Sequence, residues 1–249
     1  MKKLFFILTA ILITTTHLPA QDILQTANEA YAKGDFTKAI EGYEAALKEN
    51  GESAAVYYNL GNSYYKAGKI APSILNYERA LLLEPGNGDI RFNLEIAKLK
   101  TVDKIEPVGE FFLTSWFHSI EDSLSTDAWS RFAIACFILL IGCLFLFFFS
   151  RKILIKQFGF YAGVSLLVLV IFGNIFACNQ KKSLTQRDNA VIFVPTTTIK
   201  SSPSDSGTDL FILHEGAKVK LKNQIGNWNE IETADGNVGW IKGSEIAVI

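Results

Sequence analysis

Few side chains in this 249-residue sequence have a type and spacing that could carry out catalysis. No histidine is accompanied by a second histidine or cysteine at the spacing of a metal site. The cysteines lie in or beside long apolar runs, where packing is the simplest role. No phosphate-binding loop or nucleophile motif is present. The sequence therefore predicts no catalytic residue, metal site or cofactor, and the chemistry to look for is binding. The residues concerned are His17, His118, His214, Cys136, Cys143 and Cys178.

Two long apolar runs organise the chain, and we predict membrane helices at residues 130–150 and 158–178. At about 1.5 Å per residue, each run can cross a hydrocarbon core of about 30 Å. The turn between them, residues 151–157, carries three basic residues and no acid. Because basic turns stay in the cytoplasm, both flanking parts should lie on the other side of the membrane. The alternative is a pair of buried helices in a soluble core, but core helices are seldom apolar all round.

The first twenty residues have the pattern of a signal peptide. Lys2 and Lys3 precede a short apolar run at residues 4–13, and the small residue Ala20 marks a cleavage site. Ten apolar residues are too few to span a membrane comfortably. We therefore expect residues 1–20 to be removed and the mature chain to begin outside the cytoplasm, in agreement with the basic turn.

Residues 21–102 repeat with a period of 34 and resemble the tetratricopeptide repeat. In the second copy, the large, small and proline positions of that motif are occupied by Tyr57, Leu60, Gly61, Tyr64, Ser73, Tyr77, Ala80 and Pro85. Gly34 and Gly68 occupy matching positions that end the first helix of each copy. Residues 89–100 match the first helix of a third copy that has no second helix. We predict an α-helical solenoid of two repeats and a capping helix.

The resemblance implies a concave groove lined by the first helix of each repeat, which binds peptides or partner helices. The matching residues here are Asn28, Tyr58, Asn59, Asn62, Tyr65, Lys66 and Asn93. Some relatives bind a terminal carboxylate with two asparagines and nearby basic residues. Asn28 and Asn59 match the asparagines, but Leu24, Asp89 and Asn93 replace the basic residues, so we expect no carboxylate clamp. The alternative is that these side chains only solvate an unused groove.

Residues 103–129 link the repeats to the first membrane helix. Their apolar side chains recur at helical spacing, at Leu113, Trp116, Phe117, Ile120 and Leu124, and serines lie mostly on the other side. Two interpretations stay open. The segment is either a short helix on the bilayer surface, with Trp116 and Trp129 at headgroup depth, or a final cap on the repeats.

After a polar linker at residues 179–189, residues 190–249 read as five or six short β-strands, including a hairpin at Asp235-Gly236. The segment resembles a bacterial SH3-like domain, which implies a small all-β barrel. The matching stretches are 199–203, 214–216, 227–228 and 239–241. Such domains bind cell-wall peptide or protein segments. Trp228 is the candidate groove residue, and Trp240 is better explained as core.

The order of these modules resembles the BatE type of the Bat aerotolerance family of Gram-negative bacteria. That resemblance implies a non-catalytic scaffold in the inner membrane, with both soluble modules in the periplasm. It also implies partnership with von Willebrand A-type Bat membrane proteins and, indirectly, with a MoxR-type ATPase. The alternative function is a sensor or tether that binds peptidoglycan through the SH3-like domain. The net charge of −1 gives no indication of nucleic-acid binding.

Overall fold

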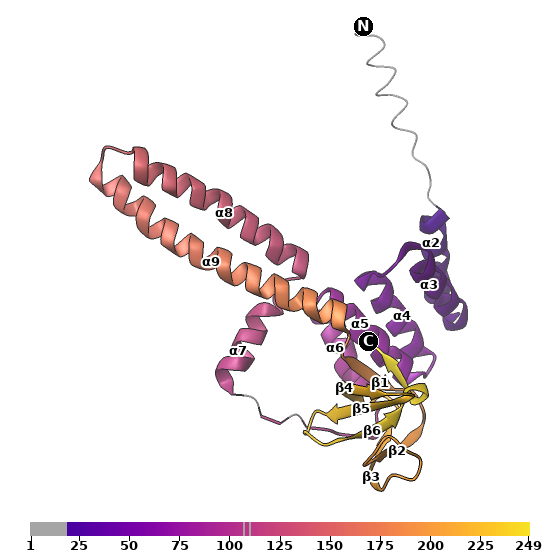
Figure 1. Cartoon of the computed structure of the whole chain (residues 1–249). Coiled ribbons are helices and arrows are strands. Elements are labelled where there is room, and N and C mark those ends of the chain that lie inside the picture. Colours follow the sequence, from indigo (N-terminus) through magenta and orange to yellow (C-terminus); the bar gives the residue numbers. More distant parts are fainter. Residues whose placement is uncertain (1–18, 107, 110) are drawn as a thin grey trace, which may run out of the picture.

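A computed structural model describes residues 19–249 except 107 and 110, so residues 1–18 of the predicted signal peptide lie outside the described residues. Short helices come first, two long helices follow, and a β-sheet ends the chain (Figure 1). The short helices are α2 (Pro19–Ala32), α3 (Phe36–Asn50), α4 (Ala54–Lys66), α5 (Ile70–Leu83), α6 (Gly88–Lys98) and α7 (Phe112–Glu121). The long helices are α8 (Thr126–Phe149) and α9 (Ile153–Gln186).

Helices α2 to α6 form the predicted repeats. Gly34 and Gly68 end the first helix of each copy with positive φ values, 79° and 76°. Glycine adopts this left-handed conformation without steric cost. The carboxylate of Asp35 then caps α3 by accepting a hydrogen bond from the backbone N–H of Lys38 at 3.1 Å. Asn87 caps α6 in the same way. The local sequence therefore sets the helix boundaries of the stack.

Close approach between α4 and α5 depends on Gly61. A Cβ atom at this position would lie 2.7 Å from the ring of Tyr77, which is fully buried. The Ser73 hydroxyl donates a hydrogen bond to the Gly61 carbonyl at 2.8 Å across the same contact. The first repeat has a similar contact between Gly42 and Ala27. A small residue at each of these contacts lets the two helices of a repeat approach closely.

The long helices α8 and α9 pack against each other as an antiparallel hairpin that extends from the rest of the molecule (Figure 1). Both are long and apolar enough to cross a membrane. Gly159, Gly163 and Gly173 are buried where α9 faces α8, and most of the large apolar side chains on the other faces are exposed. Small residues let the two backbones approach closely.

The polar linker expected at residues 179–189 is helical as far as Gln186, which corrects that prediction. The side chain of Gln180 is buried and donates hydrogen bonds to the carbonyls of Glu121 at 2.6 Å and Leu124 at 2.8 Å. These bonds fasten the extension of α9 to the segment that precedes α8. Arg187 then ends the helix in the left-handed conformation.

The C-terminal residues form one antiparallel sheet of seven strands in the order β3-β2-β6-β5-β4-β1-β7. The strands are β1 (Asn189–Ile192), β2 (Thr196–Lys200), β3 (Asp209–His214), β4 (Lys218–Ile225), β5 (Trp228–Thr233), β6 (Val238–Lys242) and β7 (Ile246–Val248). The expected barrel is not closed, because the edge strands β3 and β7 do not pair. Beside β7, the Arg79 side chain of α5 instead donates a hydrogen bond to the Val248 carbonyl at 2.7 Å.

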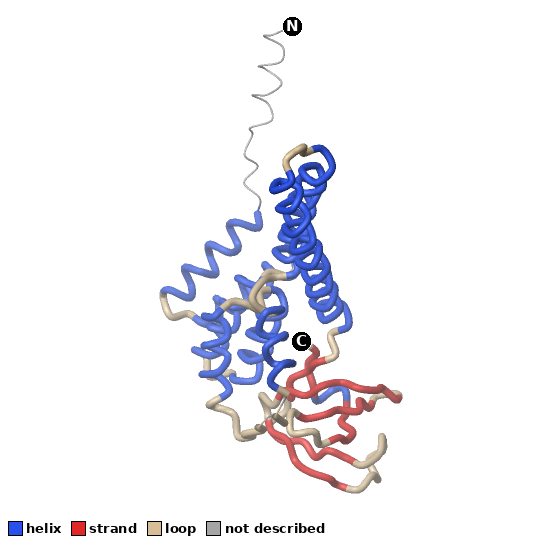
Figure 2. The backbone as a smooth tube through the Cα atoms, turned by 90° about the vertical axis from the view of Figure 1, so that its left-hand side faces the viewer, coloured by secondary structure: helices blue, strands red, loops and turns tan. Residues whose placement is uncertain are grey.

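The sheet and the repeats share a hydrophobic core. Val191 of β1 and Ile249 are buried in the same cluster as Ile74 and Leu75 of α5. Beside this cluster, the Glu78 carboxylate is 7% exposed and lies 2.7 Å from Lys218 of β4 and 3.6 Å from Lys98 of α6. Figure 2 shows the sheet directly against the helical stack. The sheet therefore packs directly against the repeats.

A second contact ties α9 to the repeats. Arg187 forms an ion pair with Glu52, in the loop between α3 and α4, and the Tyr57 hydroxyl donates to the same carboxylate at 3.0 Å. The hydrogen bond from Arg187 is the largest cause that lowers the pKa of Glu52 below its usual value. The end of the long helix is thus anchored to the loop between the two repeats.

We predict that Gly61→Ala lowers the thermal unfolding temperature of the full-length protein in detergent, followed by circular dichroism. Overpacking costs about 1–3 kcal/mol, which exceeds the gain of up to about 1 kcal/mol from replacing a helical glycine by alanine. Gly88→Ala is the matched control, because no atom lies within 4 Å of its added Cβ. Equal unfolding temperatures for the two variants would contradict the proposed close contact.

We also predict that the stabilisation from Glu52 depends on pH. The pKa of Glu52 is lower in the folded state than in the unfolded state, where it is near 4.3. The contribution of Glu52 to folding stability is therefore complete above the unfolded-state pKa and is lost as the pH falls through the folded-state pKa. The wild type should unfold at a higher temperature than Glu52→Gln at pH 7, and the difference should shrink below about pH 4. A difference that stays constant from pH 7 to pH 3 would show that the ion pair does not stabilise the fold.

Candidate protein-binding groove

The seven side chains predicted to line the groove all lie on the first helices of the repeats. Asn28 is on α2 and Asn93 is on α6, while the other five are on α4. The structure brings Tyr58, Asn62 and Asn93 together. The Asn93 amide nitrogen donates to the Tyr58 hydroxyl oxygen and to the Asn62 amide oxygen, both at 2.9 Å. These bonds link α6 to α4 across the groove.

Both repeats contain the same hydrogen bond between a buried tyrosine and a groove asparagine. The Tyr43 hydroxyl donates to the Asn28 amide oxygen at 2.6 Å, and the Tyr77 hydroxyl donates to the Asn62 amide oxygen at 2.7 Å. Each pair is 15 residues apart, and the second pair follows the first by 34 residues. Burial raises the pKa of both tyrosines, so their hydroxyls remain protonated donors at neutral pH. The two asparagine side chains are therefore held in a defined orientation.

This orientation determines what the groove offers to a ligand. The oxygen atoms of Asn28 and Asn62 accept hydrogen bonds from within the protein, and among the described residues their amide nitrogens have no partner. Each nitrogen carries two N–H donors. The Tyr58 hydroxyl accepts from Asn93 and keeps its own proton to donate. These N–H and O–H groups are donors whose chemistry suits the carbonyl oxygens of a peptide backbone.

The remaining predicted residues do not join this network. The Asn59 carbonyl accepts a hydrogen bond from the Ser63 hydroxyl, a contact within α4. Tyr65 is half-buried against the shared core, and Lys66 is exposed at the end of α4.

The repeat period also points to two exposed apolar side chains that were missed in the sequence. Phe92 of α6 and Leu99, the residue that caps the end of α6, stand 34 residues after Tyr58 and Tyr65, and their side chains are 66% and 73% exposed. The period could have identified them, because they stand at the same repeat positions as the two tyrosines.

Trp228 lies elsewhere, on β5 of the sheet. It is half-buried, and the Lys242 ammonium group lies 5.4 Å from the centre of its ring. Both border a shallow hollow of about 520 Å³ whose other polar side chains include Asp205, Gln224 and Asn227. Trp240, expected to be core, is half-buried on the neighbouring strand β6.

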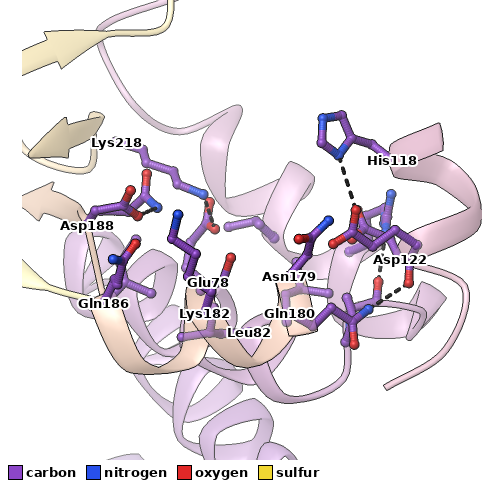
Figure 3. A pocket seen from close by; sticks show the side chains of 18 of the residues that line it. Glu78, Leu82, His118, Asp122, Asn179, Gln180, Lys182, Gln186, Asp188 and Lys218 are labelled. Carbon is purple, nitrogen blue, oxygen red and sulfur yellow. Dashed lines mark hydrogen bonds and ion pairs between the residues drawn. The ribbon is translucent and has the colours of Figure 1, made fainter. Parts of the chain in front are cut away.

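A cleft of about 650 Å³ separates α5 and α6 from the extension of α9. Figure 3 shows Lys218 directed at Glu78 in its floor, with Gln180 and His118 toward the other end. Acidic and basic side chains are mixed along its walls, and Glu78 is already paired. Among the described residues, no three histidine, cysteine or acidic side chains are grouped so that they could hold a metal ion.

Comparisons with known proteins agree with the repeats. A "TPR repeat" family model matches residues 27–68, and a "Tetratricopeptide repeat" model matches residues 54–87. The chain is similar to the "Protein CTR9 homolog" of Arabidopsis thaliana, with 35% identity over 82 residues, or 30% of this chain and 8% of the relative. It is also similar to the "Peroxisomal targeting signal receptor" of Saccharomyces cerevisiae, with 33% identity over 69 residues, or 28% of this chain and 11% of the relative. The similarity covers only a small part of each relative.

We predict that Asn62→Ala destabilises the protein by about 1–3 kcal/mol, because it leaves the buried Tyr77 hydroxyl without its acceptor. Adding Tyr77→Phe should recover part of that loss, since the unpaired hydroxyl is then removed. Denaturant unfolding of the wild type, both single variants and the double variant measures this coupling. Asn59→Ala is the control and should be close to neutral. Additive effects of the two substitutions would contradict the proposed hydrogen bond.

Proposed function

We propose that this protein is a non-catalytic, membrane-anchored scaffold whose tetratricopeptide groove binds a segment of a partner protein. The observation that carries the proposal is the ordered row of hydrogen-bond donors on Asn28, Asn62 and Tyr58. These groups are oriented by bonds inside the protein, so a ligand does not have to order them. Preorganised donors reduce the entropic cost of binding.

The apolar hairpin supports anchoring in a membrane. Its large exposed apolar side chains would be solvated by lipid, and its backbone hydrogen bonds are made within each helix. The turn with Arg151 and Lys152, followed by Lys156 in the first turn of α9, is at one end of the hairpin, while the repeats and the sheet are both at the other end (Figure 1). By the positive-inside rule, both would face the periplasm from the inner membrane.

The module order suggests the partners. As in the Bat aerotolerance proteins that the chain resembles, we propose a complex with von Willebrand A-type membrane proteins, served by a MoxR-type ATPase. Because the repeats are fixed to the base of the hairpin, the groove would lie near the membrane. It would suit a partner that is also held in the membrane, since anchoring both proteins raises their effective concentration.

A second candidate function rests on the hollow beside Trp228. A half-buried aromatic ring with amide, carboxylate and ammonium groups around it suits the sugar or peptide units of peptidoglycan. In this case the sheet would tether the protein to the cell wall, and the repeats that pack against the sheet would hold the sheet in its position.

Two variants of the full-length protein separate these functions. A double variant, Asn28→Asp and Tyr58→Phe, removes donors of the network, while the aspartate keeps an acceptor oxygen for the Tyr43 hydroxyl. Purification from native membranes in mild detergent, followed by mass spectrometry, should show that this variant loses membrane-protein partners that the wild type retains. Trp228→Ala should keep these partners. If the double variant retains them while Trp228→Ala abolishes cosedimentation with cell-wall sacculi, the wall-binding function is correct instead.

A further inference from the structure

Helix α7 has a strongly apolar side that the described chain covers only in part. Its residues Phe112, Leu113, Trp116 and Phe117 are 41–69% exposed, and no residue of α7 is buried. On a helical projection at 3.6 residues per turn, these side chains share one face with Ile120. Thr114, Ser115 and His118 fall on the opposite face. The helix is therefore amphipathic, and both its apolar and its polar side are exposed.

Contacts at the C-terminal end of α7 fix its place beside the hairpin. The Glu121 carbonyl accepts hydrogen bonds from the Trp129 indole N–H at 2.8 Å and from the Gln180 amide at 2.6 Å. The ring of Phe117 lies 6.3 Å from the ring of Phe172 on α9. The apolar side of α7 therefore continues the apolar surface of the hairpin and is not used to cap the repeats.

The contact with Phe172 sets the depth of α7 along the hairpin. Apolar residues of α9 end at Cys178, and the first strongly polar residue beyond them is Asn179. Seven residues of helix separate Phe172 from Asn179, a rise of about 10 Å. Amphipathic helices that lie in a membrane interface bury their apolar face about 5–10 Å deep. The position of α7 matches the boundary between headgroups and acyl chains.

We propose that α7 lies in the outer leaflet of the bilayer as an interfacial helix, with Trp116 inserted at the acyl boundary. The proposal rests on insertion of the hairpin proposed above. The apolar surface is continuous from the hairpin to α7. Lipid that surrounds the hairpin would therefore also contact the apolar side of α7. His118 is the only basic residue on α7, and it pairs with Glu121 at 3.8 Å. Insertion therefore needs no anionic lipid. Trp129, in contrast, is buried against Phe176 and does not reach lipid.

The position of α7 can be measured in the full-length protein reconstituted in phosphatidylcholine vesicles. Cys136, Cys143 and Cys178 are replaced by alanine, and single cysteines carry an environment-sensitive fluorophore. Trp116→Cys probes the apolar face, Ser115→Cys is the matched control on the polar face, and Ile141→Cys reports on the middle of the hairpin. Lipids that carry a nitroxide near the headgroup or near the chain end serve as quenchers.

We expect the probe at 116 to be quenched more strongly by the shallow nitroxide than the probe at 115, with the probe at 141 quenched by the deep nitroxide. If 141 is quenched while 116 behaves like 115, the hairpin is inserted but α7 is not on the bilayer, which overturns the proposal. A probe at 116 that is shielded from water but not quenched by lipid also overturns it, because protein then covers the helix. Absence of quenching at 141 overturns insertion of the hairpin, and the interfacial helix with it.

A second measurement avoids the cysteine replacements. Brominated phosphatidylcholine should quench tryptophan fluorescence of the otherwise native protein more than that of Trp116→Phe. That substitution keeps the apolar face and removes only the reporter. Equal fractional quenching of the two proteins would contradict the insertion of Trp116.

Discussion

The structure depends on the burial of helix α5 on two sides. One side packs against α4 and α6 within the repeat stack, and the other packs against β1 and the last residues of the chain. Ile74 has no exposed surface in this arrangement, and Glu78 is buried between two lysines. A carboxylate buried with one partner removed is costly, so the contacts of Glu78 with α6 and β4 hold both elements in place. The sheet therefore behaves as part of the repeat stack.

The same arrangement sets the orientation of the groove helices relative to the hairpin. Helix α9 runs without a break from the apolar hairpin to Gln186, and only two residues separate it from β1, which packs against α5. Gln180 fixes the base of the hairpin, and the Arg187 pair with Glu52 fixes the end of the helix to the loop before α4. Helix α4 carries most of the groove side chains. A partner bound there would have a set orientation relative to the hairpin.

Interactions that repeat in the sequence could be predicted, and those that join distant segments could not. The 34-residue period and the motif it resembles marked Gly61 and Tyr77 as repeat positions, the resemblance implied the asparagines, and the period also contained the missed positions Phe92 and Leu99. In contrast, the bonds from Lys218 to Glu78 and from Arg79 to the Val248 carbonyl join segments 140 and 169 residues apart. A repeat pattern in the sequence cannot predict contacts between segments this far apart. Strand patterns predicted an all-β segment, but they do not reveal that its edge strands β3 and β7 are unpaired or that Arg79 of α5 donates to the Val248 carbonyl of β7.

The most direct test of this account is the distance distribution between spin labels in the full-length protein in lipid, measured by pulsed electron resonance. Exposed positions at Glu41 on α3, Lys181 on α9 and Gln224 on β4 report on the repeats, the hairpin base and the sheet. One rigid body predicts a single narrow distribution for each pair of labels. Broad distributions for the pairs that include Glu41 would show that the repeats move independently of the sheet and hairpin, and would contradict the account.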